Sequence, residues 1–239
     1  MKEKTERETR DHRWIAASGL LFVATWIVGL LVASPPAATT PMAEVIAYYE
    51  ANRAMVMLFA YLANGLTGIL LMVFASALHS VLRRAEGESS TLSSLLLVSG
   101  TVVTSLSCLE ALFMQVLANH IAATHDVAVI RTLLELNVEI DTFKLLILGI
   151  MIAAASLLFW RVKAVPPWLV WVGAVETLLL VAASGNTLFP GEVLTIALYV
   201  SGLGLLIWTA AVSVMMGWRG RAVRAGGGLT APSIEVQQH

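Results

Sequence analysis

The fold of this chain is decided by residues 135–163, which read ELNVEIDTFKLLILGIMIAAASLLFWRVK. From Leu145 to Trp160 the stretch contains no charged side chain, and Arg161 and Lys163 follow directly. A hydrocarbon core about 30 Å thick needs about 20 mainly apolar residues of helix, because unpaired backbone polar groups are too costly there. The stretch therefore predicts a membrane-spanning helix whose first turns carry polar and charged side chains.

The composition of the whole chain also indicates a membrane protein. Of its 239 residues, 58% are apolar and 13% are charged, and the mean hydropathy is +0.80. A soluble domain carries about 25% charged residues. The formal charge of -1 provides no basic field for nucleic acid, and the single cysteine, Cys108, permits no disulfide within the chain. The lipid bilayer is thus the partner that we expect, and nucleic acid is excluded.

Five further segments have the length and apolar character of a span. The fourth span has a polar start near Val129, and the other five are residues 14–33, 55–82, 95–118, 168–183 and 193–218. We expect an all-α fold, a polytopic membrane helix bundle of six transmembrane helices within residues 14–218. Residues 1–13 form a predicted N-terminal tail. Residues 219–239 form a tail that we expect to be disordered, since its last part shows no periodicity.

The basic residues indicate how the chain crosses the membrane. Twelve of the fifteen Lys and Arg lie in the two tails and in the loops around 83–84 and 161–163, which six spans place on one side. Cytoplasmic loops carry an excess of basic residues, and Trp side chains gather at membrane interfaces. We expect a multi-pass protein of the cytoplasmic (plasma) membrane with both termini cytoplasmic. The tryptophans expected at the cytoplasmic interface are Trp14, Trp160, Trp168 and Trp218.

The first outer loop contains the segment MAEVIAYYE at residues 42–50. Val45, Ile46 and Tyr49 fall on one face at helical spacing, and the two glutamates fall away from it. The pattern predicts a short amphipathic helix on the outer surface of the bundle. Two interpretations stay open: a packing element between two spans, and a lid over a site.

Four charged residues fall at depths where hydrocarbon penalises charge. Glu110 lies about 15 residues into the third span and Glu176 about ten residues into the fifth, so both are near the midplane. Lys144 lies about 25 Å from the cytoplasmic boundary, and Asp141 precedes it by three residues. Such residues face a bundle interior or a cavity. We expect Glu110 and Glu176 to be acid/base groups that floor one polar pocket, with Lys144 and Asp141 as an electrostatic clamp.

A structural role is the alternative for each of these groups. The two glutamates would then be neutral carboxyls that hydrogen-bond neighbouring side chains, and Lys144 would form an ion pair with Asp141. Further polar residues complete the predicted pocket as substrate-binding groups. They are Gln115 and Asn119 in the third span, Asn64 and Tyr61 in the second, and Asn137 and Glu139 in the fourth. Gly65 and Gly68 form a small face that indicates close helix packing.

No cofactor or metal is predicted. The chain contains no Walker loop, no dinucleotide glycine fingerprint, no nucleophile elbow and no Asp-rich magnesium motif. His120, His125 and Asp126 are close in sequence, but a spacing of five residues does not place both rings on one helical face. We interpret them as a solvated loop end, and a metal site at these residues stays an open alternative.

The layout resembles a broad class of six-span bacterial, especially actinobacterial, integral membrane proteins that are grouped as a domain of unknown function. The shared features are Ala43–Tyr49 after the first span, Pro166-Pro167-Trp168-Leu169 at the start of the fifth, and Leu206-Ile207-Trp208 in the sixth. The resemblance covers nearly the whole membrane region. It implies the six-span architecture and the inner membrane of a bacterial cell, and it carries no catalytic residue.

Three functions remain open from these residues. The first is a membrane-embedded enzyme whose outward-side pocket performs acid/base chemistry on a small or amphipathic metabolite. The second is a proton-coupled transporter or exporter that uses the same carboxylates as a relay. The third is a non-catalytic partner that binds another protein through its outer loops. The sequence leaves the oligomeric state open.

Overall fold

The computed structural model describes residues 2–37, 39–87, 90–186, 188–189 and 191–226. These residues form helices and no strand, which confirms the predicted all-α class. In chain order the elements are α1 (Lys2–Val32), α2 (Met42–Phe59), the π-helix η1 (Ala60–Leu66), α3 (Thr67–Glu86), α4 (Thr91–Thr124), α5 (Val127–Val162), α6 (Pro167–Ser184) and α7 (Glu192–Gly226). Six helical segments of the described chain are long and apolar enough to cross a membrane, with α2, η1 and α3 joined in one of them. The chain is therefore a multi-pass membrane protein.

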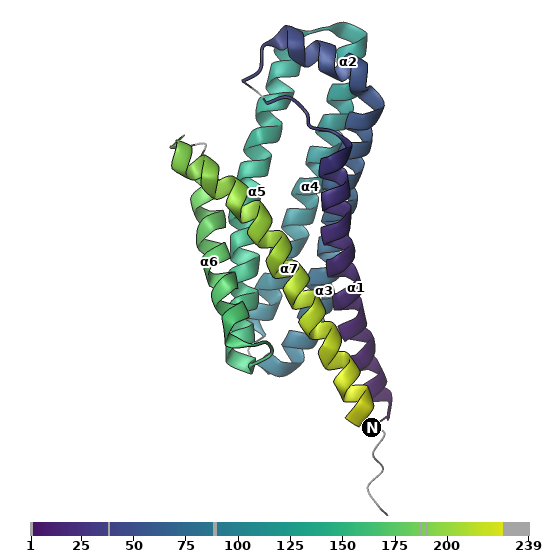
Figure 1. Cartoon of the computed structure of the whole chain (residues 1–239), viewed down its shortest axis with the longest axis vertical. Coiled ribbons are helices and arrows are strands. Elements are labelled where there is room, and N and C mark those ends of the chain that lie inside the picture. The colour runs from purple at the N-terminus through teal and green to yellow at the C-terminus, as the bar shows by residue number, and fades with distance from the viewer. Residues whose placement is uncertain (1, 38, 88–89, 187, 190, 227–239) are drawn as a thin grey trace, which may run out of the picture.

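The spans form a closed ring of helices that run alternately up and down. Helix α1 packs against α3, α3 against α4, α4 against α5, α5 against α6, α6 against α7, and α7 back against α1. The start of α1 and the last turns of α7 lie at the same end of the bundle (Figure 1). We call this the terminal end, and we call the opposite end, where α2 lies across the bundle, the α2 end (Figure 1).

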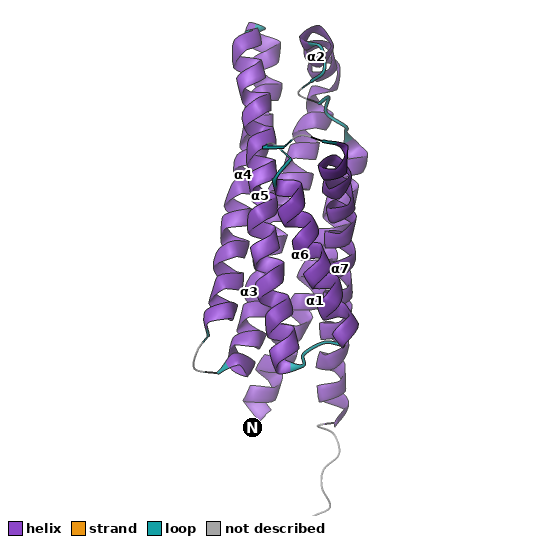
Figure 2. Ribbon diagram, turned by 90° about the vertical axis from the view of Figure 1, so that its left-hand side faces the viewer, coloured by secondary structure: helices purple, strands orange, loops and turns teal. Residues whose placement is uncertain are grey.

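The helices differ in length, and this sets the shape of the α2 end. Helix α6 has 18 residues, whereas α4 has 34 and α5 has 36. At 1.5 Å per residue, α6 is about 27 Å long, and α4 and α5 are each more than about 50 Å long. The α4–α5 hairpin therefore extends past the end of α6 and, with α2, projects beyond the other spans (Figure 2).

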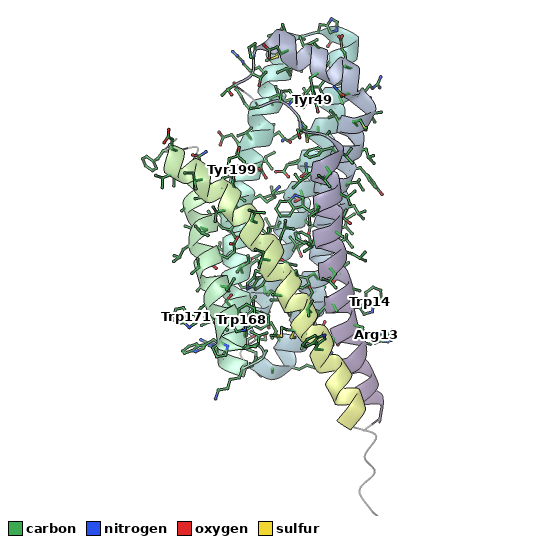
Figure 3. The ribbon with its side chains drawn as sticks, viewed as in Figure 1. Arg13, Trp14, Tyr49, Trp168, Trp171 and Tyr199 are labelled. Atoms are coloured by element: carbon green, nitrogen blue, oxygen red, sulfur yellow. The ribbon has the colours of Figure 1, made fainter. Side chains whose placement is uncertain are left out.

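The amphipathic helix predicted at residues 42–50 is confirmed as the first part of α2. Val45 and Tyr49 are fully buried, Ile46 is partly buried, and Glu44 is exposed. Figure 3 shows Tyr49 on this helix at the α2 end. The backbone leaves helical geometry at Asn52 (φ -118°, ψ 19°), and there the chain turns from the transverse helix into the second span.

Two separate apolar clusters hold the described part of the bundle together. The larger cluster lies within the spans and includes Phe74, Phe159 and Trp208. The smaller cluster joins α2 to the tips of α4 and α5, through Val45, Tyr49 and residues such as Leu117 and Ile130. The transverse helix is thus packed on the long hairpin by its own apolar core.

Small residues let the second span approach its neighbours closely. A Cβ on Gly68 would lie 2.9 Å from Ser107 Cβ, and the Thr104 hydroxyl donates to the Gly68 carbonyl at 2.8 Å. The close packing predicted for this face is therefore confirmed at Gly68. Just before it, η1 widens the helix, and Thr67 Oγ1 donates to the Leu62 carbonyl at 2.6 Å. Single π-helical turns of this kind occur frequently at functional sites.

The first and last helices extend beyond the predicted spans. Helix α1 already begins at Lys2, because residues 2–13 are rich in helix formers such as Lys, Glu and Arg. Helix α7 continues past Trp218 to Gly226, and the remainder of the predicted disordered tail, residues 227–239, lies outside the described residues. The side chains of Trp14 and Trp168 are exposed and lie toward the terminal end (Figure 3), as expected for residues at a membrane interface.

Candidate functional site

A cavity of about 380 Å³ lies where the two apolar clusters meet. Helices α1, α4 and α5 form most of its wall, and α2, η1, α3, α6, α7 and the loop after α1 contribute the other residues. Its lining is mainly apolar. The polar residues of the lining are Tyr49, Asn64, Thr67, Ser107, Glu110, Asn137, Asp141, Lys144 and Ser201.

A charged triad stands in the cavity wall between α4 and α5. Lys144 Nζ lies 2.5 Å from Glu110 Oε2 and 2.8 Å from Asp141 Oδ1. The pair within α5 follows from the three-residue spacing, which places Asp141 and Lys144 on one face of the helix. Glu110 reaches Lys144 from the facing helix α4. One cation is therefore shared by two carboxylates.

The exposed fraction of the side chains increases through the triad from Glu110 to Lys144 to Asp141. The side chain of Glu110 is 2% exposed and that of Lys144 is 12% exposed, whereas that of Asp141 is 50% exposed. Counted back from Arg161, Lys144 lies about 26 Å along α5, within the depth of a hydrocarbon core. Asp141, three residues further along α5, lies about 30 Å from Arg161 and so at the outer edge of such a core, where water or a polar ligand can surround its half-exposed carboxylate. The triad therefore connects a buried carboxylate in the membrane region to the polar edge of the bundle.

Three buried polar atoms around the cavity have no hydrogen-bond partner within the described part of the chain. They are the Tyr49 hydroxyl on α2, Oε1 of Glu110 on α4 and Oδ1 of Asn137 on α5. A buried polar group left without a partner costs about 1–3 kcal/mol, so such atoms are normally bonded to something. Their gathering around one cavity indicates a site for a polar ligand or for ordered water.

Glu176 does not belong to this cavity, which corrects the expectation that it shares one pocket with Glu110. Its carboxyl packs between α6 and α7, and a Cβ on Gly204 would lie 1.9 Å from its Oε2. Ser156 and Gly149 of α5 lie beside Gly173 and Leu180 of α6, so Glu176 is at a level between them. This level is roughly 13 Å closer to the terminal end than Lys144. The two glutamates have different depths and different surroundings.

Four other predicted pocket residues also lie outside the cavity lining. Asn119 accepts a hydrogen bond from Arg53, Tyr61 and Glu139 are exposed, and Gln115 is half-buried. The reason is the phase of the helices. Glu139 stands about 200° around α5 from Asp141 or Asn137, and Gln115 stands about 140° around α4 from Glu110. Similar depth placed these residues in the predicted pocket, but their helix faces turn elsewhere.

Asn64 and Asn137 do line the cavity, as expected. Asn64 lies in the π-helical segment, and its amide donates to Met114 Sδ at 3.7 Å. Tyr49 is the main site residue that the sequence does not predict, because the pattern at residues 42–50 places it only on the apolar face of the amphipathic helix. Its hydroxyl was the available signal, since a polar group on an apolar face needs a partner.

Two of the three residues at which the sequence leaves a metal site open, His125 and Asp126, contact other parts of the chain. His125 Nε2 lies 2.7 Å from Glu50 Oε1, which joins the α4–α5 turn to α2. Asp126 caps α5 by accepting from the backbone of Ala128 and Val129 at 3.0 and 3.2 Å. Among the residues that the structure describes, no three His, Cys, Asp or Glu side chains are grouped as metal ligands. His125 and Asp126 thus have structural contacts.

The chemistry of the site follows from the way Glu110 is held. Lys144 binds one of its carboxylate oxygens, while the other oxygen accepts no hydrogen bond from the described residues. Such a carboxylate is oriented by one oxygen and can exchange a proton through the other.

Comparison with known proteins identifies no relative, since no family model, no curated protein and no solved structure matches this chain.

Proposed function

We propose that this protein is a membrane-embedded enzyme that performs acid/base chemistry on a small or amphipathic molecule in the cavity beneath α2. The observation that carries the proposal is Glu110, which is buried in the cavity wall, held by Lys144 at 2.5 Å and left with one oxygen unbonded by the described residues. The cavity volume of about 380 Å³ is within the range of small-molecule sites.

The proposed roles follow from position. Glu110 takes up or releases a proton through Oε1, and Lys144 stabilises its carboxylate through Oε2. Asp141 holds Lys144 from the hydrated side of the triad. Asn64 and Asn137 orient the substrate with their amide groups. Glu176 takes no direct part in this chemistry, because it lies outside the cavity.

We also propose the cytoplasmic membrane of a bacterium as the location, with both termini in the cytoplasm. The distribution of basic residues supports the orientation, because the α2 end of the bundle carries only two of the fifteen Lys and Arg, which are Arg53 on α2 and Arg131 on α5. In this orientation the cavity lies in the outer half of the membrane. A cytoplasmic reporter fused after His239 should then be active, and an active external reporter at that position would reverse the orientation.

The acid/base proposal is tested by Glu110→Gln, which keeps the shape of the side chain but removes its titratable proton. The protein in lipid nanodiscs is incubated with an extract of amphipathic bacterial metabolites, and converted compounds are identified by mass spectrometry. We expect Glu110→Gln to lower conversion at least about 100-fold. Glu139→Gln is the matched control, because Glu139 is exposed on α5 and outside the cavity. Full conversion by Glu110→Gln would refute the proposal.

A proton-coupled carrier is the second candidate. It is favoured by Glu176, a second buried carboxyl at a different depth, whose Oε1 also lacks a partner among the described residues. Two carboxyls at successive depths are what a proton relay requires. Proteoliposomes distinguish the two candidates: a carrier moves a compound along a pH gradient and leaves it chemically unchanged, and this movement would depend on both Glu110 and Glu176.

A further inference from the structure

The charges in the cavity wall are unequal. Among the described residues, the charged groups that line it are Glu110, Asp141 and Lys144, so the wall has a net charge of -1 when all three are ionised. Lys144 already donates to both carboxylates. Of the polar atoms that have no partner among the described residues, the Tyr49 hydroxyl can donate or accept, whereas Glu110 Oε1 and Asn137 Oδ1 can only accept, and the half-exposed carboxylate of Asp141 adds further acceptor capacity. These groups would be complementary to a ligand that donates hydrogen bonds and carries a positive charge.

Five of the residues that line the cavity are aromatic. Its aromatic residues are Phe22, Trp26, Tyr49, Phe59 and Phe113, and they come from α1, α2 and α4. Aromatic rings bury apolar groups, and their faces attract cations. The ring-bearing wall and the acidic triad belong to one cavity. They would suit the two ends of one amphipathic molecule.

We propose that the substrate class of this cavity is an amphipathic amine that binds as its ammonium ion. The ammonium group donates to Asp141 and to the free oxygen of Glu110, and the apolar body packs on the aromatic wall. This inference rests on the proposed function, because it takes the cavity to be the substrate site. The first chemical step would then be a proton transfer: the ammonium N–H bond breaks, the proton forms an O–H bond on Glu110 Oε1, and a neutral amine and a neutral carboxyl remain.

A ligand of opposite charge is disfavoured by the same groups. A carboxylate ligand would meet two acidic side chains, and the one cation in the wall is already engaged by both of them. Placing like charges together in a partly dehydrated site is a strong means of rejection. A neutral alcohol can donate one hydrogen bond but gains no charge attraction. We therefore expect affinity to decrease from ammonium to alcohol to carboxylate.

Three probes with one skeleton test this order: 4-phenylbutylammonium, 4-phenylbutanol and 4-phenylbutyrate. Binding is measured at pH 7 by equilibrium dialysis against the full-length protein in phosphatidylcholine nanodiscs, with empty discs as the blank. We expect the ammonium ion to bind at least about tenfold more tightly than the alcohol, and the carboxylate to bind most weakly. Asp141→Asn should weaken ammonium binding about tenfold and leave alcohol binding unchanged. Glu139→Gln should leave all three affinities unchanged.

Equal affinities for the three probes, tighter binding of the carboxylate, or an Asp141→Asn variant that binds the ammonium ion as well as the parent would overturn the inference. Circular dichroism confirms that the variant is folded, and unchanged alcohol binding confirms that its cavity is intact. The two proposals fail separately. If the ammonium preference holds while Glu110→Gln keeps full conversion, the acid/base role of Glu110 fails and the ligand class stands. If conversion needs Glu110 but the converted compound is an anion, the ligand class fails alone.

Discussion

Replacing Lys144 by Met removes the cation shared by Glu110 and Asp141, and we expect this change to destabilise the bundle by about 3 kcal/mol. Glu110 and Lys144 are 2% and 12% exposed, so the substitution leaves a buried carboxylate without its partner. Loss of one partner from a buried pair costs about 3–5 kcal/mol. We expect the lower end of this range because only the Glu110–Lys144 pair is fully buried. Asp141 is half exposed and regains water when Lys144 is removed, so loss of the Asp141–Lys144 pair adds at most about 1 kcal/mol. Met has a similar length and keeps the packing of the stem.

Glu110→Gln should cost only about 1 kcal/mol, because Lys144 keeps Asp141 and can still donate to the amide oxygen. The double variant Glu110→Gln/Lys144→Met contains no stranded charge on Glu110. We expect it to be more stable than Lys144→Met, with a coupling free energy of about 2 kcal/mol between the two positions. Unfolding in mixed micelles of dodecyl maltoside and SDS, followed by circular dichroism, measures all three variants.

Arg84→Met is the control for loss of a basic side chain. Arg84 pairs with Asp11, and these side chains are 36% and 16% exposed. A pair with this access to water contributes about 0–1 kcal/mol. If Lys144→Met costs no more than Arg84→Met, or if the double variant shows purely additive losses, the buried pair is not a source of stability and the reasoning fails.

Three further substitutions test separate parts of the structure. Gly204→Ala would place a Cβ 1.9 Å from Glu176 Oε2 and should lower the free energy of unfolding by about 1–3 kcal/mol. In the control variant Gly202→Ala the new Cβ has its nearest neighbour 3.9 Å away, so this change should be neutral or stabilising. Equal shifts of the melting temperature in the two variants would contradict the packing of Glu176 on α7. Tyr49→Phe removes a buried hydroxyl that has no partner among the described residues. The change should therefore not destabilise the protein, but it should weaken ligand binding in the dialysis assay. A loss of stability would show that the hydroxyl is bonded. Asp126→Ala should cost about 1 kcal/mol through loss of the α5 cap, and Asp126→Asn should retain it; an equal loss in both variants would point to charge rather than capping.

The amino-acid sequence by itself determined the helices and their environment. Each span was predicted because the transfer of about 20 mainly apolar residues from water to hydrocarbon is favourable, and the helix at 42–50 was predicted from the apolar face that its spacing creates. Both signals are local, because each depends only on side chains that are neighbours along one helix. The Asp141–Lys144 pair was also predicted from a local signal, because residues that are three positions apart lie on one face of a helix.

Only the tertiary structure decided which of the buried polar groups act together. Glu110 and Glu176 have similar predicted depths, yet one meets Lys144 and the other packs at Gly204. The difference lies in the rotation and height of each helix, and these are set by close approaches such as that of Gly68 to Ser107. Such contacts join residues that are far apart in the chain. Their outcome depends on the fit of whole helix surfaces, which the period of a single helix does not contain.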